Sequence, residues 1–157
     1  MMTAVQLAEL ESLYRREYRR FLRVAVAILR DESRAVDAVQ EAFASAIRKQ
    51  QQFRGEGPLE AWIWRMVVNA ALKERSRRRH EELGDLELAA PPEEPTPVAE
   101  AITRLPERQR LALFLRYYAD LDYASIATAL EVSPGTVGAT VNAAHASLRR
   151  LLQEVRP

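Results

Sequence analysis

The chain has 157 residues, of which 48% are hydrophobic and 29% charged, and it contains no cysteine. This composition lies above that of disordered chains and suits a globular protein with one medium core or two small ones. The absence of cysteine excludes disulfides and thiolate metal sites, and the only two histidines, His80 and His145, are too far apart in the sequence to suggest a local pair of ligands. We therefore expect no metal or other cofactor.

The N-terminus lacks the apolar core of a signal peptide, and no apolar run approaches the roughly 20 residues that span a bilayer. We expect a cytoplasmic protein without membrane insertion. Its net charge is only +1, but residues 1–80 hold 16 Lys and Arg against 10 Asp and Glu, whereas residues 81–100 hold 7 acidic residues and no basic one. A basic block, an acidic segment and a nearly neutral block indicate a domain, a linker and a second domain.

Three helices are predicted in the first block, because apolar residues recur there at spacings of three and four. The first predicted helix runs from about residue 14 to 29, and Asp31 or Ser33 can cap the second. The segment 53–58, FRGEGP, interrupts the pattern with two glycines and a proline. The third helix follows and ends in a run of basic residues, 73–80. Its apolar face is formed by Leu59, Trp62, Ile63, Met66, Val67 and Ala70.

Residues 81–100 combine four prolines with acidic and small residues, a composition that favours extended chain over a packed core. Helical patterns resume at residues 110–118 and 123–130. A last helix begins with Ser133 as its cap and Pro134 in its first turn. Two short helices joined by a tight turn, the second with a capped start, form a helix-turn-helix pattern. We predict an all-α protein of two small helical domains joined by an acidic, proline-rich linker.

The last helix has an unusual surface, because residues 133–148 contain no charged side chain. Val137, Val141, Ala144, Leu148 and Leu151 step by four, three, four and three, which makes them the buried stripe. The outward face is then formed by Thr136, Gly138, Ala139, Thr140, Asn142, Ala143, His145 and Ala146.

Four motifs occur in the order and spacing of one protein family: DAVQEAF at 37–43, FRGEGPLEAWIWRMVVNAAL at 53–72, LPERQRLALFLRY at 105–117 and DYASIATALEVSPGTV at 122–137. Over roughly residues 10–152 the chain resembles the extracytoplasmic-function sigma factors, the smallest bacterial proteins of the sigma-70 type. The resemblance implies a region 2-like domain at 1–82, a linker at 83–101 and a region 4-like helix-turn-helix domain at 102–157. It also implies a protein without catalysis of its own that directs core RNA polymerase to promoter DNA.

The first implied site binds the polymerase. In the family, the helix that matches residues 37–47 docks on the clamp helices of the largest polymerase subunit, and Asp37, Gln40 and Glu41 share its outward surface. The charges alone favour an ordinary solvated face, and only the position of these residues in the family pattern reverses that interpretation. The C-terminal domain would bind the polymerase flap.

The second implied site recognises and opens the −10 element. Trp64 lies off the apolar stripe that holds Trp62, so we expect Trp64 to face DNA and stack on an unpaired base. Asn69 can donate and accept at once, which suits the reading of a flipped base. The arginine run suits phosphate binding, although cations also stabilise a helix C-terminus. The predicted set is Phe53, Arg54, Trp64, Arg65, Asn69, Lys73, Arg75, Arg77, Arg78 and Arg79.

The third implied site, for the −35 element, departs from the family. Family members carry several Lys or Arg where this chain has Gly138, Thr140, Ala143 and His145, and a glycine where it has Glu131. Without arginine there is no bidentate contact to guanine, so we expect weak recognition of A/T-rich DNA or none. The predicted contacts are Ser133, Thr136, Thr140, Asn142, His145 and Arg149.

Two rival functions remain. The chain would be a sigma-like interaction module if its C-terminal domain binds an anti-sigma factor, or an activator that supplies the missing DNA affinity. A plain helix-turn-helix repressor would explain residues 105–152 but leaves residues 37–69 without a purpose. An enzyme is disfavoured, because no cluster of a nucleophile, a base and an orienting group is visible.

Overall fold

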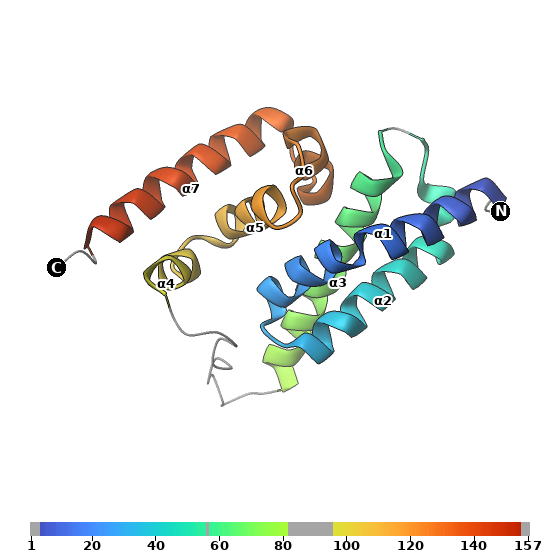
Figure 1. The fold of residues 1–157 in the computed structure, drawn as a ribbon, viewed down its shortest axis with the longest axis horizontal. Coiled ribbons are helices and arrows are strands. Elements are labelled where there is room, and N and C mark those ends of the chain that lie inside the picture. The colour runs from blue at the N-terminus through green and yellow to red at the C-terminus, as the bar shows by residue number, and fades with distance from the viewer. Residues whose placement is uncertain (1–3, 56, 82–95, 155–157) are drawn as a thin grey trace.

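The computed structural model describes residues 4–55, 57–81 and 96–154, and this part of the chain is helical and contains no β-strand. The N-terminal half contains α1 (Ala4–Leu29), α2 (Glu32–Arg48), a short 3-10 helix (Gln50–Gln52) and α3 (Leu59–Glu81), and the C-terminal half contains α4 (Pro97–Thr103), α5 (Glu107–Tyr117), α6 (Tyr123–Leu130) and α7 (Pro134–Glu154) (Figure 1). The predicted all-α organisation in two helical parts is confirmed.

Helices α1, α2 and α3 form a bundle around fully buried apolar side chains such as Phe21, Val39 and Val67. Phe21 also meets Phe43 of α2 edge to face, with ring centroids 5.4 Å apart. Such contacts contribute beyond the burial of area alone. Asp31 is the cap of α2, since its carboxylate accepts a hydrogen bond from the main-chain N–H of Arg34 at 3.0 Å. One of the two predicted capping residues is thereby identified.

Helix α4 lies where the sequence pattern predicts linker. The expected boundary at residue 102 divides this helix, which begins at Pro97. The side chain of Thr96 accepts a hydrogen bond from the main-chain N–H of Ala99 at 3.1 Å, and proline is well suited to the first helical position. The cap and the proline therefore start a helix inside a proline-rich segment. The predicted linker residues 83–95 lie outside the described residues.

Helices α6 and α7 form the predicted helix-turn-helix. Ser133 caps α7 by accepting a hydrogen bond from the main-chain N–H of Thr136 at 3.1 Å. The turn between the helices passes through Glu131, whose φ of 59° and ψ of 43° put it in the left-handed region. The predicted buried stripe of α7 is confirmed: Val137, Val141, Ala144 and Leu151 are buried, and the partly buried Leu148 packs against the cluster that contains Ala144 and Leu151.

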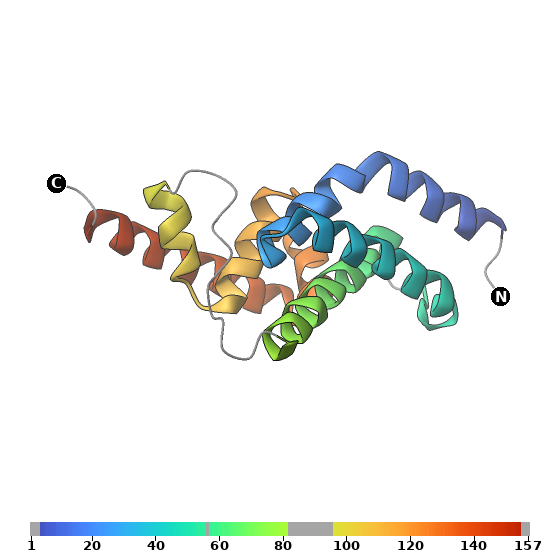
Figure 2. The same ribbon diagram turned by 90° about the horizontal axis from the view of Figure 1, so that it is seen from below.

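The two halves share one hydrophobic core. Among the described residues, the larger buried cluster joins side chains of α1, α2 and α3 to side chains of α5, α6 and α7. A second, smaller cluster, which includes Leu105, Leu113 and Leu151, belongs to the C-terminal half. Helix α6 packs against α3, and α5 touches α1 (Figures 1 and 2). The C-terminal half is therefore docked on the N-terminal half in this structure.

The cap of α6 leads to a prediction about stability. The carboxylate of Asp122 accepts a hydrogen bond from the main-chain N–H of Ser125 at 2.8 Å, and this bond holds the pKa of Asp122 below its ordinary value of 3.8. We expect Asp122→Ala to lower the free energy of unfolding by about 1 kcal/mol, whereas Asp122→Asn keeps most of the cap. Chemical denaturation measures both variants.

The pH dependence of this cap has a definite sign. Because folding lowers the pKa of Asp122, the carboxylate stabilises the fold fully above pH 3.8, and this contribution is lost as the pH falls through the lower pKa of the folded chain. The difference between wild type and Asp122→Ala should therefore shrink in strong acid. A difference that is independent of pH, or absent at pH 7, contradicts the capping role.

Candidate nucleic-acid interface

The outward face of α2 carries the three residues predicted to bind polymerase. Asp37, Gln40 and Glu41 are all exposed, whereas Val39 and Phe43 of the same helix are buried. The predicted orientation of α2 is therefore correct. Glu41 pairs with Arg48 at 2.7 Å, but both side chains are well exposed, so this ion pair contributes little to stability.

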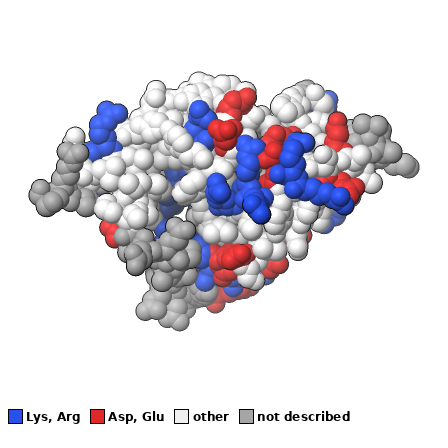
Figure 3. Space-filling view, viewed as in Figure 1, with Lys and Arg blue, Asp and Glu red and all other residues white. Residues whose placement is uncertain are grey.

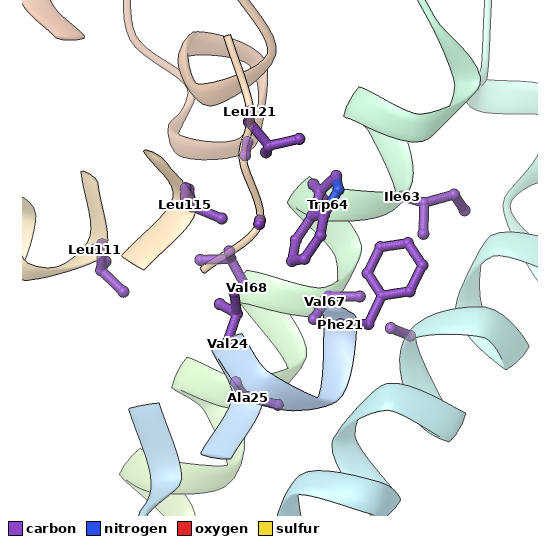
Figure 4. Close-up of a cluster of buried hydrophobic side chains, with 14 of the residues drawn as sticks. Phe21, Val24, Ala25, Ile63, Trp64, Val67, Val68, Leu111, Leu115 and Leu121 are labelled. Atoms are coloured by element: carbon purple, nitrogen blue, oxygen red, sulfur yellow. The ribbon is translucent and has the colours of Figure 1, made fainter. Parts of the chain in front are cut away.

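Trp64 does not face solvent, and its predicted orientation is wrong. Its side chain is fully buried and packs on Phe21 with ring centroids 4.4 Å apart, while Trp62 is buried beside Phe53. The apolar stripe of α3 was predicted for a helix covered on one side. Helix α3 is covered on two sides, by α1 and α2 and by the C-terminal half, so the second side buries Trp64 as well (Figure 4).

A polar face remains exposed along α3. Asn69 and Lys73 are exposed and stand one turn apart, and Arg65 lies one turn before them at the edge of this face. Residues at four-residue spacing lie one above the other on a helix. Arg54, in the loop before α3, is also exposed, and Phe53 is half-buried. These side chains can meet a nucleic-acid strand that follows α3.

The arginines at the end of α3 form ion pairs with carboxylates of different elements. Arg77 pairs with Glu74 at 2.8 Å, and the hydrogen bond from Arg77 is the main reason why the pKa of Glu74 lies below its ordinary value. Arg78 lies 3.8 Å from the carboxylate of Asp31. Arg75 pairs with Glu107 of the C-terminal half. Lys73 and Arg79 are exposed.

A second basic surface lies on α1, where the sequence prediction named no site. Arg15, Arg16, Arg19 and Arg23 are exposed, and Figure 3 shows Lys and Arg side chains gathered over this helix. The signal was present in the sequence as the run RREYRRFLR at 15–23, which has five arginines in nine residues. The sequence prediction rested on the family motifs, which begin after α1, and so placed the basic DNA-binding residues around α3.

On α7, several side chains predicted to contact the −35 element already form hydrogen bonds within the protein. Ser133 caps the helix, and the hydroxyl of Thr140 donates to the main-chain carbonyl oxygen of Thr136 at 2.7 Å. The ring nitrogen Nε2 of His145 is hydrogen-bonded to the Tyr117 hydroxyl at 2.8 Å. The hydroxyl of Thr136 is hydrogen-bonded to that of Ser133 at 2.9 Å. The remaining two predicted contacts, Asn142 and Arg149, are exposed. The outward face of α7 therefore offers few free polar groups.

Within the described ranges, no group of three or more His, Asp or Glu side chains lies together as metal ligands would. None of the helices described combines the length and the apolar character that a membrane span needs.

The sequence profile of sigma-70 region 2 matches residues 13–81, and that of sigma-70 region 4 matches residues 96–153. The chain is similar to the ECF RNA polymerase sigma factor SigM of Mycobacterium tuberculosis, with 34% identity over 90% of this chain and 76% of SigM. It is also similar to the RNA polymerase sigma-H factor of Pseudomonas aeruginosa, with 30% identity over 85% of this chain and 81% of that protein. The chain belongs to the extracytoplasmic-function sigma factors of the sigma-70 family, which are proteins of transcription initiation.

Two solved structures share the fold. CnrH in complex with the cytosolic domain of CnrY aligns with a TM-score of 0.73 at 21% identity, over 96% of this chain and 91% of that one. The sigma factor RpoE of Bartonella quintana, in complex with the anti-sigma factor NepR, aligns with a TM-score of 0.65 at 22% identity, over 96% and 95%. The family is one of transcription regulators rather than enzymes, which agrees with the expectation from the sequence.

Proposed function

We propose that the chain binds core RNA polymerase in the cytoplasm and directs it to promoters. The polymerase clamp helices would bind the exposed face of α2, and the polar face of α3 would recognise and open the −10 element. The observation that carries the proposal is that Asn69 and Lys73 line the open side of α3, while Asp37, Gln40 and Glu41 line the open side of α2. One domain thus presents an acidic and a basic face at once.

The opening step needs groups that hold a base after it leaves the duplex. Phe53 retains an exposed part beside Arg54 and stacks on Trp62, so it replaces Trp64 as the aromatic candidate. A stacked base gains about 1–3 kcal/mol from an aromatic ring without any requirement for a particular sequence. Asn69 would read the base edge, and Lys73 and Arg79 would bind phosphates and contribute affinity.

Polymerase binding is tested by charge reversal on α2. We expect Asp37→Lys or Glu41→Lys to weaken the complex with purified core polymerase about tenfold, because each change places a cation opposite the basic groups expected on the clamp. The matched control is Glu154→Lys, which reverses an exposed carboxylate at the far end of α7. Titration with fluorescently labelled chain measures the affinities. Equal affinities for all variants would refute this assignment of α2.

Base reading is tested by Asn69→Ala. The side chain is exposed, so we expect normal folding and normal polymerase binding but about tenfold less open complex, in line with the loss of one base-reading pair. Permanganate reactivity of unpaired thymines measures opening, and Asn142→Ala on α7 is the control. Wild-type reactivity in the Asn69 variant removes this residue from the site.

A second candidate function concerns the C-terminal half, as an interaction module for an anti-sigma factor or an activator. Its support is the uncharged outward face of α7 together with three exposed tyrosines, Tyr117, Tyr118 and Tyr123. Tyrosine is enriched in protein interfaces, while charged residues are depleted at their centres. Under this candidate, α7 binds the −35 element weakly and a protein partner supplies the DNA affinity.

A further inference from the structure

Helix α1 carries a straight row of arginines on its outward face. Arg15, Arg19 and Arg23 follow one another at four-residue spacing, and all three side chains are exposed. Residues at this spacing lie one above the other on a helix, separated by about 6 Å along its axis. Arg16 is exposed beside this arginine row and pairs with Glu17 at 3.3 Å. Because the other side of α1 packs on α2 and α3, the row is directed away from the bundle (Figure 3).

The arginine row is poorly neutralised within the protein. In the part of the chain that the structure describes, neither Arg19 nor Arg23 forms an ion pair with a carboxylate. Arg15 pairs with Glu11 at 2.8 Å, but the two side chains are 78% and 63% exposed, so this ion pair is weak and easily exchanged for another anion. The guanidinium groups of the row are therefore available to an external anionic partner.

The stability of the fold does not explain the arginine row. Like charges one helical turn apart repel each other and destabilise the helix that carries them. The segment 15–23 also contains five arginines and no lysine, although lysine has the same charge and a similar helix propensity. The guanidinium group differs from an ammonium group in its planar set of donors, which matches the oxygens of a phosphate or a carboxylate. The residue type and the spacing therefore indicate a binding surface for an oxyanion.

The surroundings of the row favour nucleic acid over an acidic protein as the partner. The centre of a protein interface is usually apolar and depleted of charge. Among the large apolar side chains described on α1, Leu7 is the exposed one, and it lies two turns before Arg15. Contacts to a nucleic-acid backbone, in contrast, consist largely of Lys and Arg that neutralise phosphates. The axial spacing of the row is comparable to the separation of neighbouring phosphates on one strand.

We propose that the arginine row binds successive phosphates of a DNA strand and gives the chain a second, sequence-independent DNA contact, separate from α3. Helices α1 and α3 pack against each other through their buried sides, so the row and the polar face of α3 point in different directions (Figures 1 and 2). The row therefore holds a different stretch of DNA from the one that α3 would open. Each bound phosphate releases counterions, which supplies affinity without sequence information.

The proposal is tested by binding of the full chain to a DNA duplex of random sequence and to a single strand of the same length. Fluorescence anisotropy measures the affinity at several salt concentrations. We expect the triple variant Arg15→Gln, Arg19→Gln, Arg23→Gln to bind the duplex at least about tenfold more weakly at low salt. Three lost phosphate contacts should also flatten the slope of log affinity against log salt by about 2.7 for the duplex and about 2.1 for the single strand. A loss in one arm alone identifies which form of DNA the row binds.

Two controls separate the row from net charge and from folding. The variant Arg48→Gln, Lys49→Gln, Arg104→Gln removes three exposed cations from other elements and should leave the salt slope unchanged. Replacing the three arginines of the row with lysine keeps the charge and should keep the slope. Glutamine has a helix propensity close to that of arginine and relieves the repulsion, so the triple glutamine variant should melt no lower than wild type. An equal loss in the first control, a wild-type slope in the triple glutamine variant, or a lower melting temperature of that variant overturns the proposal.

Two further measurements distinguish this proposal from a protein partner and from the role of α3. If the triple glutamine variant keeps its DNA affinity but loses affinity for core polymerase, the row binds a protein and the proposal fails. Lys73→Gln with Arg79→Gln removes the proposed phosphate contacts of α3, and we expect its loss of DNA affinity to add to that of the row, as it does for independent sites. If only the row variant loses affinity, the row stands as a DNA contact and the proposed function of α3 fails.

Discussion

Replacing Trp64 with alanine is expected to lower the free energy of unfolding of the full chain by about 3–5 kcal/mol, the usual cost of removing a large aromatic side chain from a core. The indole is fully buried between Phe21 and the C-terminal half, so no water or neighbouring side chain fills the space without rearrangement. For a chain of this size, the melting temperature should fall by roughly 10 °C or more. Denaturant titration and thermal unfolding measure the change.

The control for Trp64→Ala is Asn69→Ala, on the same helix but exposed, which should change the stability by less than about 0.5 kcal/mol. The two variants therefore separate a core residue from a surface residue. A Trp64→Ala chain that is as stable as wild type, yet poor at opening promoters, would return Trp64 to the DNA-facing role predicted from the sequence.

Adding two cations to α7 is expected to strengthen its binding to DNA, which we expect to be weak or absent in the wild type. Gly138 and Thr140 are partly exposed on the outward face, and a Cβ atom at Gly138 would approach Tyr123 only to 3.6 Å, an ordinary contact. We expect Gly138→Lys with Thr140→Arg to raise the affinity of the full chain for duplex DNA tenfold or more at low salt. Two added phosphate contacts should steepen the slope of log affinity against log salt by about 1.8.

The matched control is Gly138→Ala with Thr140→Ser, which changes the same positions without adding charge. It should leave the salt slope unchanged, although alanine gains up to about 1 kcal/mol of helix propensity over glycine. The charged variant should also weaken any protein partner that docks on this face. If the wild type already binds duplex DNA tightly, with a steep salt slope and clear sequence preference, α7 is an ordinary −35 helix.

The local features of the fold were accessible from the sequence because they depend on neighbouring residues. The stripe that includes Val137 and Val141, the Ser133 cap and the outward orientation of Asp37 all follow from helical spacing and short-range hydrogen bonds. Helix α4 was missed because its proline-rich surroundings suggested linker, although Thr96 and Pro97 form a good helix start.

The orientation of Trp64 could not be predicted in the same way. A single helix shows which residues share a face, but not how many of its faces other elements cover. Helix α3 has a second buried side because α6 packs on it, and the pairing of Arg65 with Glu131 arises from the same long-range contact. The positions of such contacts depend on the packing of both halves, which no local pattern encodes.

The proposed function is tested most directly by run-off transcription with purified core polymerase on a pool of randomised promoter sequences. We predict transcripts that require the chain, that start from templates enriched in one −10 sequence, and that decrease strongly with Asp37→Lys or Asn69→Ala but not with Glu154→Lys. A chain that binds the polymerase yet yields no chain-dependent transcript from any template in the pool would contradict a function in promoter opening.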